Sequence, residues 1–234
     1  MNEKEVIQIL KRSTLFSGLE ESFFQENARF FHPVTLKRHE GINDGLILRY
    51  FHIIAQGACT MRLTDPATGK SIAPCLLREG EGFDLLCTID DHESWAEYVS
   101  LEETLLLRIR NEYLRHWIEA YPQVSANALR QLVKIVQQLE DFSESVVFYD
   151  VKTRLAKLIL RLALKEKKRL DSNSVDIPLH LTHEVLAEMV GSVRSVVTTS
   201  LQALKKEGLI LDRRAHIIVQ DLEKLKEKLA TLLP

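Results

Sequence analysis

The sequence predicts an α+β protein with an N-terminal β-roll (a double-stranded β-helix or jelly-roll), a long helix and a C-terminal winged helix-turn-helix. Three observations support this prediction. Short segments of alternating polarity occupy residues 34–109, apolar residues repeat in heptads over 128–146, and two helical repeats separated by a glycine precede an alternating basic segment over 181–219. The expected domains are the roll at residues 1–122, the long helix at 123–148 and the winged helix at 149–234.

Composition bounds the class of protein. A chain of 234 residues can hold two modest domains, and 45% hydrophobic with 27% charged residues is the balance of an ordinary soluble protein. Met1 to Glu5 lacks the basic start of a signal peptide, and no apolar run approaches the roughly 18 residues that span a bilayer. We therefore expect a cytoplasmic protein with no membrane segment. Three cysteines without a C-x-x-C spacing predict neither a disulfide framework nor a zinc site.

The N-terminal half changes from helical to strand-like periodicity. Glu3 to Phe31 has helical spacing with a break at Leu15 to Leu19, so two short helices are expected. Short alternating segments separated by glycine-rich or aspartate-rich turns follow, and many short strands at regular spacing are typical of a barrel or sandwich. The predicted strands are Tyr50–Ile54, Ala58–Leu63, Ser71–Leu77 and Glu97–Arg108.

A long helix is expected in the middle of the chain. Asn111 to Tyr121 predicts a helix ended by Pro122, and the long helix then runs from about Gln123 to Val147. Its apolar residues are spaced 4, 3, 4, 3, 4, the a and d positions of a coiled coil. They are Ala128, Leu132, Ile135, Leu139, Phe142 and Val146. This stripe predicts a homodimer; packing against the chain's own domain alone is the alternative.

A helix-turn-helix follows a further amphipathic helix (Asp150 to Leu164) and a polar loop (Lys165 to Asp176). Thr182 can cap the first helix, and Gly191 can adopt the left-handed turn after it. The buried positions expected are Val185, Leu186, Met189 and Val190 on the first helix, and Val197, Leu201 and Leu204 on a second helix from about Ser192 to Glu207. Leu209 to Val219 alternates like two short strands joined by a charged turn, which predicts a wing.

The second helix turns one arginine and several small polar residues outward, and such a face fits the major groove of DNA. These residues are Arg194, Ser195, Thr198, Thr199 and Gln202. A helical hairpin with a purely structural role is the alternative. Residues 1–150 contain 15 Lys and Arg against 23 Asp and Glu (net −8), and residues 151–234 contain 16 against 10 (net +6). A basic C-terminal third on an acidic body favours binding to double-stranded DNA through that third.

The order of these parts resembles the CRP/FNR family of bacterial transcription regulators, whose members carry a β-roll sensor, a dimerisation helix and a winged helix. The resemblance covers nearly the whole chain. The matching segments are Leu15–Leu19, Phe31–Arg38, Tyr113–Pro122, Asp150–Ala156, Leu181–Arg194 with Val197, and Leu204–Ile210. It implies a homodimeric transcription regulator, with double-stranded DNA and RNA polymerase as partners.

The resemblance also implies roles for individual residues. Arg194 takes the place of the family's guanine-reading arginine, and Thr182 and Ser192 take places that hold phosphates. Where the family often has a second basic residue and an acidic or polar base reader, this chain has Thr199 and Ser195, so readout is expected to depend on Arg194. The predicted DNA-binding residues are Thr182, Ser192, Arg194, Ser195, Thr198, Thr199 and Gln202, with Arg213 and Arg214 in the wing.

The expected sensor departs from the family's cyclic-nucleotide pocket. Asp84 and Leu85 stand where that pocket has Gly-Glu, and Ser94 stands where it has an arginine. An aspartate without a cation repels a cyclic phosphate, so cyclic AMP is not the expected effector. Some relatives draw haem ligands from this region, which makes Cys87 and His92 the haem candidates; a buried structural cysteine and a surface histidine are the alternatives. Two further alternatives are a small apolar or acidic metabolite as the effector, and a roll that binds no effector at all.

Other classes fit the sequence less well. Three dispersed cysteines do not suit an iron–sulfur cluster, which needs about four thiolates. Thiol redox chemistry is not expected either, because no cation is evident near Cys75 or Cys87 that would lower the pKa of the thiol. A cupin-like metalloenzyme needs several histidines and a carboxylate that converge, whereas the histidines here are scattered. Neither a nucleophile elbow nor a phosphate loop occurs, so no catalytic residue is predicted. A β-roll adaptor that does not bind DNA remains as an alternative, but it gives no reason for the charge difference.

Overall fold

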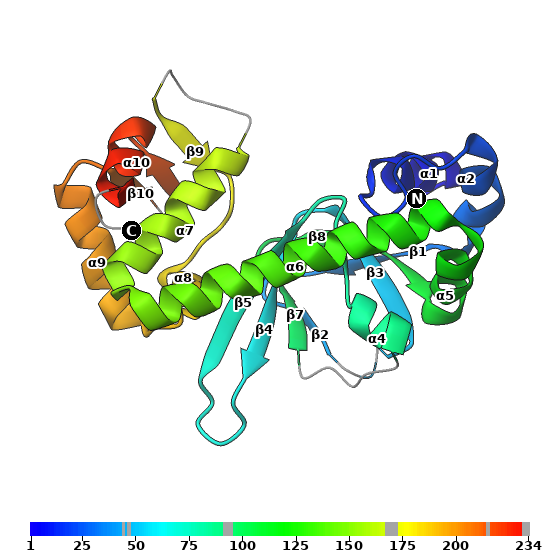
Figure 1. Ribbon diagram of the computed structural model, residues 1–234, viewed down its shortest axis with the longest axis horizontal. Coiled ribbons are helices and arrows are strands. Elements are labelled where there is room, and N and C mark those ends of the chain that lie inside the picture. Colours follow the sequence, from blue (N-terminus) through cyan, green and yellow to red (C-terminus); the bar gives the residue numbers. More distant parts are fainter. Residues whose placement is uncertain (44, 46–47, 91–95, 167–172, 214–215, 231–234) are drawn as a thin grey trace. The chain divides into compact units, whose positions relative to one another are not determined.

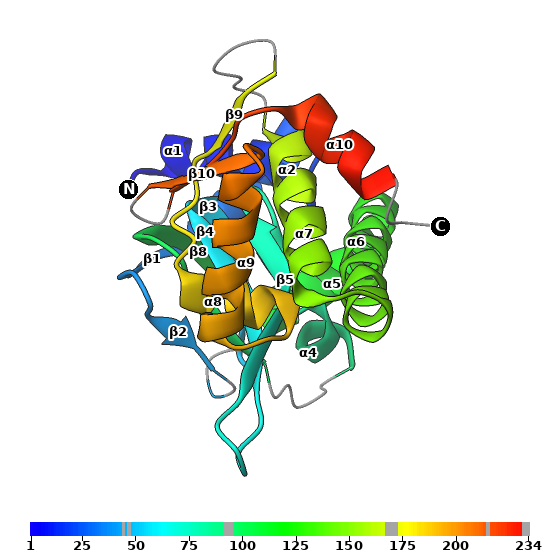
Figure 2. The same ribbon diagram turned by 90° about the vertical axis from the view of Figure 1, so that its left-hand side faces the viewer.

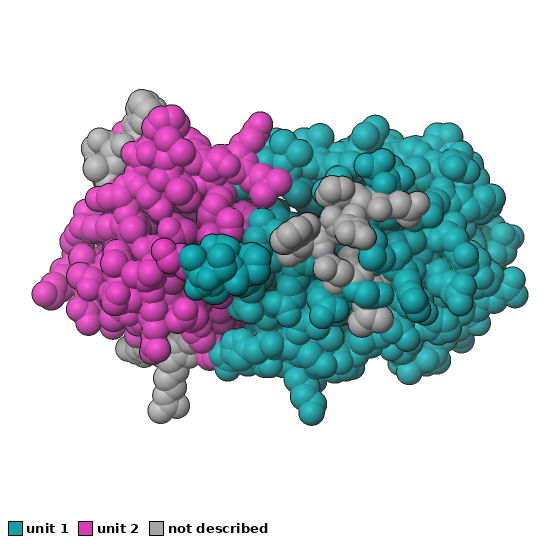
Figure 3. Space-filling model, turned by 90° about the horizontal axis from the view of Figure 1, so that it is seen from below, with its two compact units in different colours: residues 1–69, 75–138 teal, residues 70–74, 139–234 magenta. Residues whose placement is uncertain are grey.

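The computed structural model describes residues 1–234 except 44, 46–47, 91–95, 167–172, 214–215 and 231–234. The chain forms two compact units, coloured in Figure 3. Unit 1 contains Met1–Gly69 and Cys75–Gln138, and unit 2 contains Lys70–Pro74 and Leu139–Pro234. Each unit has its own core, and each is described by itself below.

Unit 1 is built on two four-stranded sheets, with strand orders β1-β8-β3-β6 and β2-β7-β4-β5 (Figure 1). The strands are β1 (His32–Leu36), β2 (Gly41–Ile42), β3 (Tyr50–Gln56), β4 (Ala58–Thr64), β5 (Ser71–Arg78), β6 (Gly82–Phe83), β7 (Ala96–Ser100) and β8 (Thr104–Arg110). The pairs β1–β8, β3–β8 and β4–β7 are antiparallel. This is the roll that the sequence predicts.

The central strands of unit 1 serve two cores because successive side chains point to opposite faces of a sheet. Ile54 and Leu106 belong to a cluster with Phe83 and residues of the second sheet. Phe51 and Leu107, on the other face, pack on the helices of the unit. The two faces explain why β3 and β8 are apolar at nearly every buried position instead of alternating with polar residues.

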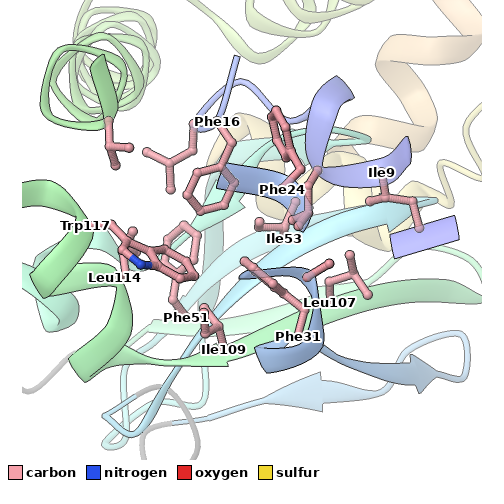
Figure 4. Close-up of a cluster of buried hydrophobic side chains, with 14 of the residues drawn as sticks. Ile9, Phe16, Phe24, Phe31, Phe51, Ile53, Leu107, Ile109, Leu114 and Trp117 are labelled. Carbon is pink, nitrogen blue, oxygen red and sulfur yellow. The ribbon is translucent and has the colours of Figure 1, made fainter. Parts of the chain in front are cut away.

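The helices of unit 1 cover one face of the first sheet. They are α1 (Glu3–Arg12), α2 (Glu21–Asn27), the 3-10 turn η1 (Ala28–Phe30), α4 (Leu85–Asp90) and α5 (Asn111–Ala120). Their core is aromatic, and Phe16, Phe31 and Trp117 gather over Phe51 in Figure 4. The ring centroids of Phe16 and Trp117 are 5.7 Å apart in an edge-to-face arrangement, which adds about 0.5–1.5 kcal/mol to simple burial.

Several elements differ from the sequence prediction, which did not contain β2, β6 or, in unit 2, β9 (Val175–Ile177) and α10 (Leu222–Ala230). The single strand expected at Glu97–Arg108 is two strands, because the chain turns after Ser100 and crosses from one sheet to the other. Apolar alternation continues on both sides of this turn, so periodicity does not reveal it. Pro122 is the first residue of the long helix, a position where its missing N–H is not needed. Helix α4 was not predicted.

Helix α6 (Pro122–Phe148) is the predicted long helix, with its first part in unit 1 and its last part in unit 2. The rest of unit 2 comprises α7 (Val151–Lys165), β9 (Val175–Ile177), α8 (His183–Val190), α9 (Arg194–Lys206), β10 (Ile210–Arg213), β11 (His216–Val219) and α10 (Leu222–Ala230). The strands form a sheet of order β10-β11-β9, and α7 packs beside α9, α10 and α8 (Figure 2). Among the described residues, no helix is both long enough and apolar enough to cross a membrane.

Candidate nucleic-acid interface

The first helix of the predicted motif forms as expected. The hydroxyl of Thr182 accepts a hydrogen bond from the backbone N–H of Val185 at 3.2 Å, so Thr182 is the N-cap of α8. The predicted apolar residues of α8 are all buried. Gly191 ends the helix at φ 62° and ψ 48°, the left-handed region. A Cβ atom at this position would lie 3.0 Å from Val146 and 3.3 Å from Phe142, so glycine is required by conformation and by space.

Helix α9 begins at Arg194, two residues later than predicted. Val197, Leu201 and Leu204 are buried, which confirms the predicted inner face. On the opposite face the side chains of Arg194, Ser195, Thr199 and Gln202 are exposed, and Thr198 is half-buried. Ser192 lies half-buried in the turn before α9. The structure therefore brings the candidate residues of α9 to one side of the motif.

The exposed side of α9 includes two apolar residues that the sequence analysis did not single out, Val193 and Val196. Valine methyl groups on a groove-entering helix can contact the methyl group of thymine. The hydroxyls of Thr198 and Thr199 donate to the carbonyls of Arg194 and Ser195 at 2.9 and 3.2 Å. The hydroxyl oxygen of Thr199 can still accept a hydrogen bond from another group, whereas that of Thr198 is also contacted by His183.

His183 connects the three parts of the motif, a role that the sequence analysis missed. Its Nδ1 lies 2.8 Å from the hydroxyl of Thr198 on α9, and its Nε2 lies 3.0 Å from the carboxylate of Asp212 on β10. A carboxylate accepts only, so Nε2 carries the hydrogen in this contact. The spacing of 29 residues between His183 and Asp212 gives no local signal. The contacts fix the first helix, the second helix and the wing against one another.

The predicted wing is present as an antiparallel hairpin. β10 pairs with β11 from Ile210 opposite Val219 to Arg213 opposite His216. Arg213 ends β10, but its side chain and the whole of Arg214 lie outside the described residues. Their contacts with DNA remain predictions.

A set of carbonyl contacts connects the end of α6 with the helix-turn-helix. Arg154 on α7 donates to the carbonyls of Val146 and Tyr149 at 2.8 and 2.7 Å, and to those of Val190 and Gly191 at 3.2 and 3.4 Å. One guanidinium thus satisfies the C-terminal carbonyls of both α6 and α8. A movement of the end of α6 must displace or carry along the turn that precedes α9.

The other end of α9 is held by charged contacts. Glu207, the C-cap of α9, accepts hydrogen bonds from Lys152 on α7 and Lys228 on α10. These hydrogen bonds, first that from Lys152 and then that from Lys228, lower the pKa of Glu207 below its ordinary value of 4.5. Helix α9 is therefore held near both ends: Arg154 bonds to the turn that precedes it, and Glu207 is bonded at its C-cap.

The predicted dimerisation stripe on α6 is divided between local packing and solvent. Ala128 and Leu132 pack into the core of unit 1, and Phe142 and Val146 contact the position of Gly191 within unit 2. Ile135 is half-buried and Leu139 is exposed. Four strongly exposed apolar side chains of α6 lie one residue after the predicted seam: Leu129, Val133, Val136 and Val147, exposed to 64%, 55%, 51% and 72%; Phe148, at the end of the helix, is also exposed to 72%.

The effector candidates lie on or near α4. Asp84 is buried at φ 70°, and its carboxylate accepts a hydrogen bond from the backbone N–H of Cys87 at 3.2 Å. The aspartate itself therefore occupies the start of α4, where an incoming anion would need those N–H groups. Cys87 is fully buried in the cluster between the sheets. Ser94 and His92 lie outside the described residues.

Comparisons with known proteins agree with this architecture. Residues 153–228 match the Crp-like helix-turn-helix domain. The CRP-like cAMP-activated global transcriptional regulator of Mycobacterium tuberculosis is 24% identical over 222 residues, which is 94% of this chain and 98% of that protein. The global nitrogen regulator of a Nostoc species is 28% identical over 153 residues, or 64% of this chain and 68% of that protein. The solved structure of a CooA mutant from Carboxydothermus hydrogenoformans matches with a TM-score of 0.74 at 20% identity, covering 94% of this chain and 95% of that one.

A two-sheet roll, a long helix and a winged helix-turn-helix with an exposed second helix define a DNA-binding transcription regulator. Residues 153–228 match the Crp-like helix-turn-helix family, and the chain is similar over nearly its whole length to a CRP-like transcription regulator. The fold class predicted from the sequence is thereby confirmed, and the comparisons support the predicted resemblance to CRP/FNR regulators.

Proposed function

We propose that the protein is a homodimeric regulator that recognises a palindromic operator, with α9 of each copy in the major groove. The observation that carries the proposal is the exposed face of α9, where one arginine and several small side chains stand on a helix fixed at both ends. Small side chains let the helix approach the base edges closely. The net charge of +6 over residues 151–234 supplies the attraction to phosphate.

Base readout is assigned chiefly to Arg194. A guanidinium can donate two parallel hydrogen bonds to guanine, a contact worth about 1–3 kcal/mol of discrimination against another base. Ser195, Thr199 and Gln202 line the same face, and Val196 is placed to contact a thymine methyl group. Thr182, Ser192 and the wing arginines are assigned to phosphates, which position the protein without reading sequence.

The homodimer is assigned to the exposed apolar side chains of α6. Leu129, Val133 and Val136 are spaced 4 and 3, which places them on one side of the helix. Burying them against a second copy, together with Leu139 of the predicted seam, would remove this apolar surface from water. Two-fold symmetry then presents two α9 helices to half-sites about 34 Å apart.

The effector is proposed to be something other than cyclic AMP, because the carboxylate of Asp84 occupies the start of α4. We assign transmission from α6 to the recognition helix to Arg154, whose guanidinium holds the ends of α6 and α8 together. RNA polymerase is the proposed protein partner, as the class of regulator implies.

Selection of binding sites from a random duplex library tests the proposal. We expect a palindromic consensus, and an affinity that falls steeply as salt rises because bound phosphates release counterions. Arg194→Ala should flatten the preference for one guanine in each half-site by about ten- to a hundredfold. Arg213→Ala should weaken all sequences alike, and Arg38→Ala, an exposed arginine of unit 1, is the matched control. Selection without a consensus, or an unchanged base preference in Arg194→Ala, would contradict it.

A further inference from the structure

A hollow of about 430 Å³ lies in unit 1 where β3 begins, β8 ends and α5 begins. This volume falls within the range of small-ligand sites. Its polar lining consists of Arg49, Tyr50, Arg110, Asn111, Glu112 and Arg115. Asp84 and Leu85, the positions where relatives of this chain are expected to bind a cyclic nucleotide, do not line the hollow, although Arg115 of the lining donates to the carbonyl of Thr88 on α4.

Positive charge is in excess around the hollow. Three guanidinium groups line it against one carboxylate, that of Glu112, which pairs with Arg110 at 3.3 Å. Arg49 is exposed, and its side chain contacts no polar partner among the residues that the structure describes. Gathering like charges is unfavourable in the absence of an anion, and it is unexpected in a region whose residues 1–150 have a net charge of −8.

The same face of the sheet continues the polar lining inward from the hollow. The guanidinium of Arg108 lies 4.8 Å from the ring centroid of Tyr50. The next residue of β3 on the same face as Tyr50 is His52, which lies opposite Arg108 in the sheet. Nε of Arg108 and Nδ1 of His52 are buried, and neither has a hydrogen-bond partner within the described part of the chain. Neither residue lines the hollow, but the guanidinium of Arg108 stacks on Tyr50, which does, so a further cation with an unpaired buried donor lies next to the lining.

The start of α5 adds to the attraction for an anion. Asn111 and Glu112 are its first two residues and both line the hollow. Arg110, at the N-cap, makes no side-chain capping hydrogen bond. The backbone N–H of Asn111 donates to the carbonyl of Arg49 at 3.0 Å, and the partial positive charge of the helix end adds to that of the guanidinium groups.

We propose that this hollow binds a compact polyanion that carries at least two carboxylate or phosphate groups. Guanidinium groups bind both oxyanions through paired N–H donors, so the chemistry shared by polycarboxylates and phosphate esters defines the ligand class. A single negative charge would leave the excess of guanidinium groups uncompensated. The proposal does not depend on DNA binding, because it concerns residues of unit 1 alone.

Calorimetric titration of the full-length protein with citrate and, separately, with pyrophosphate at low ionic strength tests the proposal. We expect at least one of the two to bind at one site per chain. Arg49→Gln combined with Arg110→Gln should weaken that binding about tenfold or more, since each removes a charge-assisted hydrogen bond. The control is Arg12→Gln combined with Arg38→Gln, which removes the same charge from exposed positions elsewhere in unit 1 and should leave binding within about twofold.

The two ligands distinguish the sources of the anion. Binding of citrate alone assigns the site to polycarboxylates, binding of pyrophosphate alone assigns it to phosphate esters, and both results support the site. Failure of both to bind at millimolar concentration overturns the proposal. Equal weakening in the two double variants also overturns it, because the attraction would then come from overall charge. No DNA is present, so failure here is independent of the DNA-binding assay.

Discussion

The winged helix and the roll differ in what their polar side chains are bound to. On α9 the side chains of Arg194, Ser195 and Gln202 are exposed. At the start of α4 in the roll, by contrast, Asp84 is buried and bonded to its own helix. The second helix of the helix-turn-helix leaves polar groups exposed, whereas at the start of α4 a carboxylate of the chain itself accepts from the helix. This difference supports the two proposals above, that α9 contacts DNA and that the effector is something other than cyclic AMP.

The largest expected effect comes from separating the two copies. Val133→Glu combined with Val136→Glu places charges on the exposed apolar side of α6 and should yield a monomer. Operator affinity should fall about a hundredfold to ten-thousandfold, because the second α9 no longer binds as part of the same molecule. Sedimentation velocity and a binding isotherm on the selected operator measure the two changes.

The matched control for this pair is Lys134→Glu combined with Gln137→Glu, which adds two glutamates at exposed polar positions of the same helix segment. We expect this variant to remain dimeric. A Val133→Glu and Val136→Glu protein that is still dimeric would assign the contact between copies to another surface. A monomer with full operator affinity would instead show that one copy binds the operator as tightly as two, so that dimerisation would not be needed for recognition by α9.

The sequence could predict the helix-turn-helix and the wing in detail, and the roll only in outline; it did not predict β9 or α10. A cap, a glycine and apolar spacing of 3 and 4 are local signals, so Thr182, Gly191 and Val197 take the predicted roles. The division of β7 from β8 depends on a crossing between sheets that leaves apolar alternation unchanged. The contact of His183 with Asp212 joins positions 29 residues apart, and the Arg49 hollow joins strand ends with a helix start. Such contacts follow from tertiary packing and have no local pattern.

Two glycines separate backbone strain from crowding in the DNA-binding unit. Gly191 and Gly208 have similar φ values of 62° and 69°, so an alanine at either site costs about 1–2 kcal/mol of strain. Only at Gly191 would the new methyl group meet Val146 and Phe142 closely; at Gly208 the nearest side-chain atom is 4.0 Å away. Gly191→Ala should therefore lower the free energy of unfolding by about 1 kcal/mol more than Gly208→Ala. Urea unfolding of both variants measures the difference, and equal losses would show that Val146 and Phe142 move aside without cost.

A smaller effect is expected from the His183 contacts. Asp212→Ala removes the acceptor of the Nε2 hydrogen bond and should cost about 1 kcal/mol of stability, whereas Asp212→Asn keeps an oxygen acceptor and should cost less than half of that. Asp90→Asn, which changes an exposed aspartate of unit 1, tests for a general effect of charge removal. If Asp212→Ala and Asp212→Asn lose the same free energy of unfolding, the contribution of this contact comes from the charge of the carboxylate and not from the hydrogen bond to its oxygen.

The smallest effect concerns Glu207, and its sign follows from the lowered pKa. A carboxylate whose pKa is depressed in the folded state contributes stability above its ordinary value of 4.5, and this contribution is lost as pH falls through the folded-state pKa. Because the Glu207 side chain is 31% exposed, the contribution is at most about 1 kcal/mol. Glu207→Gln should lower stability at neutral pH by that amount and should reduce the loss on acidification, as measured by urea unfolding from pH 7 down to pH values below 4.5. If the variant loses as much stability on acidification as the wild type, other groups are responsible for that loss. The contacts of Glu207 with Lys152 and Lys228 would then contribute little to holding the C-terminal end of α9.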